Sequence, residues 1–333
     1  MKRQRRSLWL PSVASRRTFF LFAALLVIAA GLPARYVVEG VSMAPGLAAG
    51  DVVRSGWFSL GDRWRKPRRF ERWAVAATDG TAIKRVVGLP GERVALQDGD
   101  LVIDDRTVLK QPRLLAELGL AVAPGEPPPV TGRRNDERWT AAPQEVLDDV
   151  GVEAVRSHVL LPVRDVGVAV ILLVRELPVE GFVRVRVQVG SHVVPWRLTA
   201  TGRHAIVAGR LDGHLVAVAW ELVQAGASRN ASRSCLPALP PARWQVAVPW
   251  FATGDDELAS PQLAIMCEAP PDTVSLERAS LWRDVLYRPG ANGSHSWSLN
   301  ADECFVLGDH PAASTDSRQW GPIPLSHLRH IIP

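Results

Sequence analysis

The sequence is poor in cysteine. Only Cys235, Cys267 and Cys304 occur among 333 residues, and none of their spacings is that of a metal-binding Cys-x-x-Cys pair. The sequence also lacks a P-loop, a His-Glu-x-x-His motif, an EF-hand loop and internal repeats. These absences exclude the common nucleotide, zinc and calcium motifs. Cys235 and Cys267 could form a disulfide in an oxidising compartment or remain buried thiols, and the sequence leaves both alternatives open.

Lysine is also scarce. Of 39 lysine and arginine residues, only Lys2, Lys66, Lys84 and Lys110 are lysines. Arginine keeps its proton in proteins, whereas a lysine can be tuned to act as a base. Lys84 lies in a β-branched run, so a side chain on the apolar face would have a lowered pKa and could accept a proton. The alternative is that strand alternation places Lys84 in solvent.

One long uncharged apolar run lies near the N-terminus, at residues 18–32. With its flanks it approaches the roughly 20 residues that span a bilayer, and the basic residues before it favour a cytoplasmic N-terminus. We predict a cytoplasmic tail at residues 1–16 and an uncleaved signal anchor at 17–36. The rest of this single-pass protein would lie on the outer, periplasmic face of the cell membrane. A cleavable signal peptide is the alternative, but Ile28 or Leu32 would then stand at the minus-three position, where a small residue is required.

A second basic cluster lies at residues 63–73, where arginines alternate with Trp64, Phe70 and Trp73. Aromatic and cationic side chains together suit a membrane surface with anionic head groups. Nucleic acid is the alternative partner, but the sequence has no recognised nucleic-acid-binding module. We therefore expect the lipid bilayer as a partner, and no nucleic acid.

The remaining sequence is typical of a mainly β fold. Asp98-Gly99 and Asp79-Gly80 predict tight hairpin turns within an all-β region at residues 51–110, and a Pro- and Gly-rich linker follows at 111–136. Turn residues then separate strand-like runs at intervals typical of a β-sandwich. These runs lie at residues 158–163, 166–174, 182–189, 193–198 and 214–221.

Three segments carry motifs. They are Gly-x-Ser-Met-x-Pro at residues 40–45, the run around Lys84 at 83–92, and Gly-Asp…Ser-x-Asp-Ser-Arg-x-Trp-Gly at 308–321. A serine nucleophile needs a base, and no histidine lies in the first two segments. In this order after an apolar run, the segments resemble the type I (leader) signal peptidases, membrane-bound serine proteases with a Ser/Lys dyad.

The resemblance implies a serine endopeptidase that removes signal peptides from secreted preproteins. Ser42 would be the nucleophile and Lys84 the general base. Ser314 would donate or accept a hydrogen bond at the lysine amine and orient it, and an ion pair would support the site from beneath. The residues assigned to support of the dyad are Ser314, Asp316, Arg318 and Asp309.

The resemblance also implies how the substrate binds. The peptide would lie extended beside edge strands that carry Ser42 and Lys84, with its small side chains in shallow apolar pockets lined by Met43, Leu47 and Ile83. The Ser42 N–H would be the main oxyanion donor. Gly40 stands where some members have a serine hydroxyl, so a second donor is in doubt. No metal or cofactor is implied, because a side chain is the base and backbone amides hold the oxyanion, and we expect a monomer.

The implied organisation is a signal-peptidase-like β catalytic domain at residues 37–111 and 303–333. A large β-rich, sandwich-like insert at 112–302, including the Pro-rich linker, would have a structural or docking role. One alternative is the self-cleaving repressor family, which shares a Gly-x-Ser-Met element and a lysine base but carries a helix-turn-helix. Another is a membrane-anchored binding module in which Ser42 is incidental.

Overall fold

The computed structural model describes the chain from residue 32 onward, with gaps. The described residues are 32–56, 61–62, 65–78, 80–121, 138–141, 146, 148, 161–222, 236–237, 240–250, 263–270, 272–289, 293 and 295–333. The predicted tail and most of the predicted anchor lie outside these ranges. No helix within them is long and apolar enough to cross a membrane. Residues 35–36, which we assigned to the anchor, instead begin strand β1 (Arg35–Val37).

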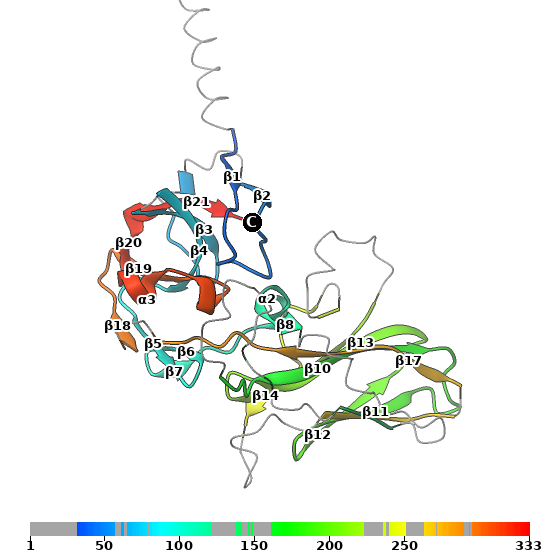
Figure 1. Cartoon of the computed structure of the whole chain (residues 1–333). Helices are drawn as coiled ribbons and strands as arrows, with labels where there is room; N and C mark the ends of the chain where they lie inside the picture. The colour runs from blue at the N-terminus through cyan, green and yellow to red at the C-terminus, as the bar shows by residue number, and fades with distance from the viewer. Residues whose placement is uncertain are drawn as a thin grey trace, which may run out of the picture.

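The fold is mainly β, as predicted, and has two domains (Figure 1). We call the part built from residues 32–109 and 285–333 the terminal domain, and the part built from 120–283 the inserted domain. The terminal domain contains a five-stranded sheet, a four-stranded sheet and the β1–β2 hairpin. The five-stranded sheet has the order β20 (Ile323–Pro324), β19 (Glu303–Leu307), β4 (Gly80–Gly88), β3 (Arg72–Ala77), β21 (Leu328–Ile332). The four-stranded sheet has the order β18 (Ser296–Ser298), β5 (Arg93–Gln97), β6 (Asp100–Ile103), β7 (Arg106–Thr107), and β2 spans Val52–Arg54.

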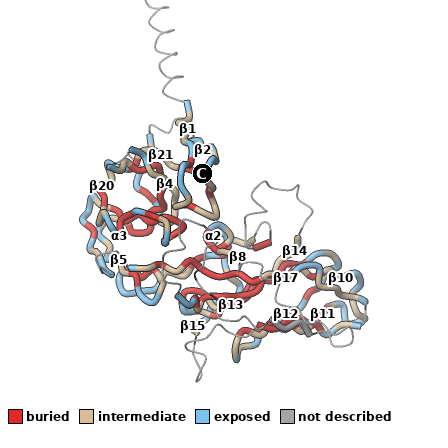
Figure 2. The backbone as a smooth tube through the Cα atoms, in the orientation of Figure 1, coloured by how far each residue is buried: buried red, intermediate tan, exposed pale blue. Residues whose placement is uncertain are grey.

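Strand β4 is the centre of the terminal domain. It pairs with β3 along its length and with β19 from Arg85 to Gly88. All five residues from Lys84 to Gly88 are buried, which Figure 2 shows as the red interior of this domain. Consecutive residues of a strand point to opposite faces, so burial of the whole run means that both faces are covered. Val86 packs in one apolar cluster with Trp73, and Val87 packs in another with Phe305.

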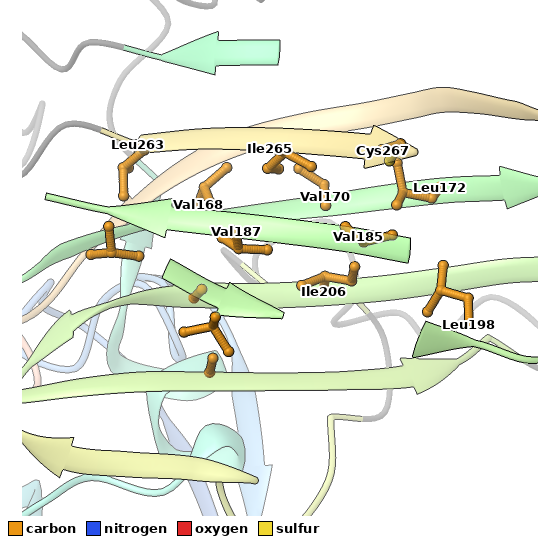
Figure 3. Packing of buried hydrophobic residues seen from close by; sticks show 14 of the residues in the cluster. Val168, Val170, Leu172, Val185, Val187, Leu198, Ile206, Leu263, Ile265 and Cys267 are labelled. Carbon is orange, nitrogen blue, oxygen red and sulfur yellow. The ribbon is translucent and has the colours of Figure 1, made fainter. Parts of the chain in front are cut away.

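The inserted domain is the predicted sandwich. Its larger sheet has the order β15 (Val246–Pro249), β14 (His214–Glu221), β13 (Gly202–Leu211), β10 (Val166–Val174), β17 (Val274–Arg283), β8 (Leu120–Ala121). Its smaller sheet has the order β12 (His192–Leu198), β11 (Val183–Val189), β16 (Leu263–Glu268), β9 (Arg138–Ala141). Valines that alternate along β11 face β10 across one shared core (Figure 3). Two predicted strands, 166–174 and 214–221, coincide with β10 and β14, whereas the run at 158–163 lies mostly outside the described residues.

The linker prediction is wrong at its start, because helix α2 (Pro112–Leu118) occupies that position. Pro112 begins the helix, where its missing N–H leaves no hydrogen bond unmade. Leu115 packs into the inserted domain beside Trp282, and Leu118 packs into the terminal domain. The helix therefore holds the two domains together instead of separating them.

We predicted that the insert ends at residue 302, but the chain re-enters the terminal domain before that residue. Strand β18 pairs with β5, and Val285 and Tyr287 already pack in the core of the terminal domain. This pairing joins segments about two hundred residues apart in sequence, so no local pattern announces it.

Neither of the described aromatic residues in the basic cluster at 63–73, Phe70 and Trp73, is exposed, and contact of this cluster with lipid stays a prediction. Trp73 is fully buried, because β3 is an internal strand whose side chains pack in the core. Arg69 is held by Glu92 and by the carbonyl of Val87, and Arg65 pairs with Glu71. Arg65 and Arg69 thus bind groups of the domain itself, whereas Lys66 and Arg68 are exposed. Trp64 lies outside the described residues.

The cysteines give no metal site in the described part of the chain. Cys304 is a buried thiol in β19, and its pKa is raised to about 12 by burial and, less, by the charge of Glu303. Cys267 is buried in the sandwich core, and Cys235 lies outside the described residues, so the two alternatives for this pair stay open.

Candidate active site

Ser42 lies on the loop that joins β1 to β2. The loop folds back on itself, with the Leu47 N–H donating to the carbonyl of Met43 over 2.8 Å. The Lys84 Nζ donates a hydrogen bond to the Ser42 Oγ over 2.9 Å. Two residues that are 42 positions apart in sequence thus lie within hydrogen-bond reach of each other.

Lys84 is buried, with 3% of its surface exposed. Burial lowers its pKa below the ordinary value, and Arg318 adds to this effect, while the charges of Asp316 and Asp309 oppose it. The alternative in which strand alternation leaves Lys84 in solvent is therefore wrong, because both faces of β4 are covered. A neutral amine directed at a serine hydroxyl has the geometry of a general base.

Ser314 is close to the dyad, but its hydroxyl has a different partner from the one predicted. The Ser314 Oγ donates to the Asp316 Oδ2 over 2.7 Å. Among the hydrogen bonds of the described residues there is none between Ser314 and Lys84. A carboxylate two residues away is the stronger acceptor, and the Lys84 amine is already directed at Ser42. Ser314 therefore contacts the charged support of the site.

Asp316 and Arg318 form the predicted ion pair. Two parallel bonds join them, from Nε to Oδ1 over 2.8 Å and from Nη2 to Oδ2 over 2.9 Å, and both side chains are buried. Asp316 also accepts from the N–H of Gly308 and caps helix α3 (Ser317–Trp320) in a capping box. This carboxylate thus orders the whole turn that faces Lys84. The short 3-10 helices η4 (Pro311–Ala313) and η5 (Leu325–His327) flank it.

Asp309 accepts hydrogen bonds from Arg85, the residue next to Lys84, which the sequence reasoning did not assign to the site. Two bonds of 2.7 Å join the guanidinium to the Asp309 carboxylate, and Arg85 also donates to the carbonyl of Phe70. Burial alone would lower the pKa of Arg85, but the Asp309 carboxylate outweighs it and raises that pKa above its ordinary value. The signal available in the sequence was its place directly after Lys84.

His310 is a second residue that the reasoning did not assign. The backbone N–H of His310 donates to the carbonyl oxygen of Ser42 over 3.0 Å, and the ring Nδ1 lies 3.3 Å from the carbonyl oxygen of Val41. Gly308 lies between Ser314 and the loop that carries Ser42, and its lack of a side chain lets the two approach each other. A Cβ at Gly308 would stand 2.2 Å from the Ser314 Oγ and 2.6 Å from the Ser42 carbonyl oxygen.

The three residues predicted to line substrate pockets do lie together. Met43 and Leu47 are buried, and Ile83 packs partly buried against them, in a small cluster with Val38 and Val53. The cluster packs beneath the loop that carries Ser42. Its use as a substrate pocket stays a prediction.

Two further features concern the reaction. No described residue accepts a hydrogen bond from the Ser42 N–H, and a Cβ added at Gly40 would meet no atom within 4 Å.

The prediction that Lys84 lies on an edge strand is only half right. Strand β4 is internal, but β19 covers it only from Arg85 onward, so the Gly80–Lys84 segment is paired with β3 alone among the described strands.

The model of the family "Signal peptidase, peptidase S26" matches residues 12–134 and 269–330, more than half of the chain. The match contains all three motif segments and nearly all of the terminal domain, whereas residues 135–268 of the inserted domain lie outside it. A search of curated proteins gives no match. The resemblance that the motifs indicated is thereby confirmed. Because the match covers more than half of the chain and includes the segments that carry Ser42 and Lys84, the chain belongs to the signal peptidase family, peptidase S26.

Proposed function

We propose that this protein is a membrane-bound serine endopeptidase that cleaves signal peptides from exported preproteins, with Ser42 as nucleophile and Lys84 as general base. Membership of the signal peptidase family supports a serine peptidase with this class of substrate. The observation that carries the proposed dyad is the 2.9 Å hydrogen bond between the Lys84 Nζ and the Ser42 Oγ.

In this mechanism the neutral amine of Lys84 takes the proton of the Ser42 hydroxyl as the oxygen attacks the scissile carbonyl carbon. The Ser42 N–H donates to the oxyanion that forms. Lys84 then gives its proton to the leaving amine, which releases the mature protein and leaves the signal peptide as an ester on Ser42. Water, deprotonated by Lys84, hydrolyses the ester and restores the serine.

The substrate binds as an extended strand beside Gly80–Lys84, the part of β4 with one unpaired side in the described structure. Such pairing brings the scissile bond to Ser42, and small side chains at minus one and minus three contact the cluster of Met43, Leu47 and Ile83. No metal ion or cofactor is needed for these steps, and one chain supplies every group.

The membrane part of the proposal rests on the apolar run at residues 18–32. Apolar side chains are exposed where the described chain begins and on the β1–β2 hairpin, with exposures of 57% at Leu32, 56% at Val37 and 46% at Val52. Exposed apolar groups beside a bilayer anchor suit contact with lipid. The catalytic domain then works at the outer face of the membrane, where preproteins emerge.

The test is cleavage of a preprotein by the purified full-length chain in detergent. Ser42→Ala and Lys84→Met should each reduce kcat by about 10³-fold or more, since each removes a member of the reacting pair. Ser298→Ala and Lys66→Met are matched controls at exposed positions and should keep full activity. Full activity in either dyad variant, with the thermal unfolding temperature unchanged, contradicts the dyad.

A further inference from the structure

Four carboxylates meet at the junction of the two domains. Asp100 comes from β6 of the terminal domain, Asp165 precedes β10, Asp212 lies in the β13–β14 turn, and Asp284 directly follows β17. One oxygen of each lies within 4.8 Å of those of the others. All but Asp100 are buried. None of them belongs to the proposed dyad or to its support.

The cluster has more negative than positive charge. The fully buried Lys110 Nζ donates to Asp212 and, over 2.7 Å, to Asp284, and the Arg210 guanidinium lies 3.4 Å from Asp165. Two cations contact the four carboxylates, so the carboxylates of the cluster outnumber the cations that contact them. Two more distant charges at the rim, on Asp98 and Arg164, are of opposite sign. Uncompensated charge is costly in a buried site.

A second observation points to a ligand. The Oδ1 of Asp284 is buried and accepts no hydrogen bond of normal geometry from a described residue, although the carboxylate interacts with the Val285 N–H and its Oδ2 accepts from Lys110. Asp284, Asp100 and Asp165 line a small cavity of about 40 Å³. A buried carboxylate oxygen without a donor of normal geometry is the group that a cation satisfies, and a cavity of this size has room for one ion or one to two water molecules.

We propose that this junction binds one hard divalent cation of the calcium type through Asp100, Asp165, Asp212 and Asp284. The cluster has no histidine or cysteine, and an all-oxygen donor set is what calcium and magnesium prefer. Calcium-to-oxygen distances of about 2.3–2.6 Å place opposite ligands about 4.6–5.2 Å apart, whereas magnesium requires about 4.0–4.2 Å. The 4.8 Å spread of the four oxygens fits calcium better.

One bound ion offsets the excess of carboxylates over cations. Lys110 keeps its bonds to Asp212 and to the Oδ2 of Asp284, while the Oδ1 of Asp284 and the partly exposed Asp100 face the ion. Asp100 belongs to the terminal domain, whereas the other three carboxylates lie in the inserted domain or at its edge. An ion bound by all four therefore stabilises the association of the two domains.

The experiment uses the full-length chain in detergent after treatment with EDTA. Calorimetric titration with CaCl₂ should give one site per chain, and titration with MgCl₂ should give weaker binding. Asp100→Asn and Asp284→Asn should each weaken calcium binding at least tenfold. Asp105→Asn, at an exposed acid in the turn after β6, is the matched control and should bind within twofold of the unchanged chain.

Thermal unfolding supplies a second measurement. Calcium should raise the Tm of the unchanged chain but not that of Asp100→Asn, and without calcium this variant should be at least as stable, because the cluster then has one carboxyl group fewer. If Asp284→Asn fails to fold because Lys110 loses a partner, Asp100→Asn decides the question. Absence of binding up to about 10 mM calcium, above the range of weak extracellular sites, overturns the proposal. Equal affinity in Asp100→Asn, or tighter binding of magnesium, also overturns it.

Discussion

The backbone N–H of His310 donates a hydrogen bond to the carbonyl oxygen of Ser42 over 3.0 Å. The two residues belong to the two separate parts of the terminal domain, on either side of the inserted domain. The loop that carries Ser42 is therefore held by the C-terminal part of the chain, while Lys84 comes from the N-terminal part. The geometry of the proposed dyad depends on how closely these parts pack.

Gly308 packs closely against both Ser314 and the Ser42 loop, so Gly308→Ala should impair the site. The new Cβ would stand 2.2 Å from the Ser314 Oγ and 2.6 Å from the Ser42 carbonyl oxygen, and the neighbouring backbone would have to shift. A displacement of about 1 Å costs about 10²-fold in rate, so we expect kcat to fall by about that factor. The measurement is preprotein cleavage in detergent. Gly56→Ala, where an added Cβ meets no atom within 4 Å, is the control and should keep full activity; equal activity of the two variants contradicts the prediction.

The pH dependence of kcat/KM should follow deprotonation of Lys84. Only the neutral amine can accept the serine proton, so activity rises with pH and levels off above the pKa of Lys84. Burial, with a smaller contribution from Arg318, lowers this pKa, so the ascending limb lies below the ordinary lysine range near pH 10.5. A pH–rate profile of the full-length enzyme measures this limb. The variant His310→Gln should show the ascending limb at the same pH as the unchanged enzyme. If the limb disappears in this variant, His310 and not Lys84 is the general base.

Asp309→Asn should destabilise the fold far more than Glu117→Gln does. Both carboxylates contact Arg85, but Asp309 is buried and bonded to it twice, whereas 46% of the Glu117 side chain is exposed. Removing the partner of a buried charge costs about 3–5 kcal/mol, and an exposed pair contributes up to about 1 kcal/mol. Denaturant unfolding of the two full-length variants in detergent compares these free energies. Similar losses in both would show that Asp309 does not hold Arg85 in the way its geometry indicates.

Gly40→Ser should raise kcat. The position has no neighbouring atom within 4 Å of an added Cβ and does not adopt a left-handed φ, so the serine fits without strain. Its hydroxyl can supply a second oxyanion donor beside the Ser42 N–H, and one such donor contributes at most about 10²–10³-fold. Single-turnover cleavage measures the change in the chemical step. Gly40→Ala, which adds only the Cβ, is the control, and an equal rate for Ser and Ala at this position would leave no role for the hydroxyl.

Much of the fold followed from local patterns. Strands β10 and β14 coincide with their predicted ranges, because alternating and continuous apolar runs report burial directly. The turn at Asp98-Gly99 was likewise predictable, since both residues adopt the positive φ that this dipeptide favours. Helix α2 was not predictable in this way. Its Pro112 marks a helix start as readily as a linker, and only its contacts with both domains decide between them.

The sequence by itself determined the family and the candidate pair of Ser42 and Lys84, because short motifs carry the residue types that the chemistry needs. Only the tertiary structure decided that Lys84 is buried, since a second layer of packing covers the face that alternation alone would leave in solvent. It also decided that the Ser314 hydroxyl bonds to Asp316. The four carboxylates at the domain junction come from positions up to 184 residues apart, and no spacing in the sequence announces them. Hydrogen-bond partners and charge clusters depend on distances in space, which the chain sets only when both domains have folded.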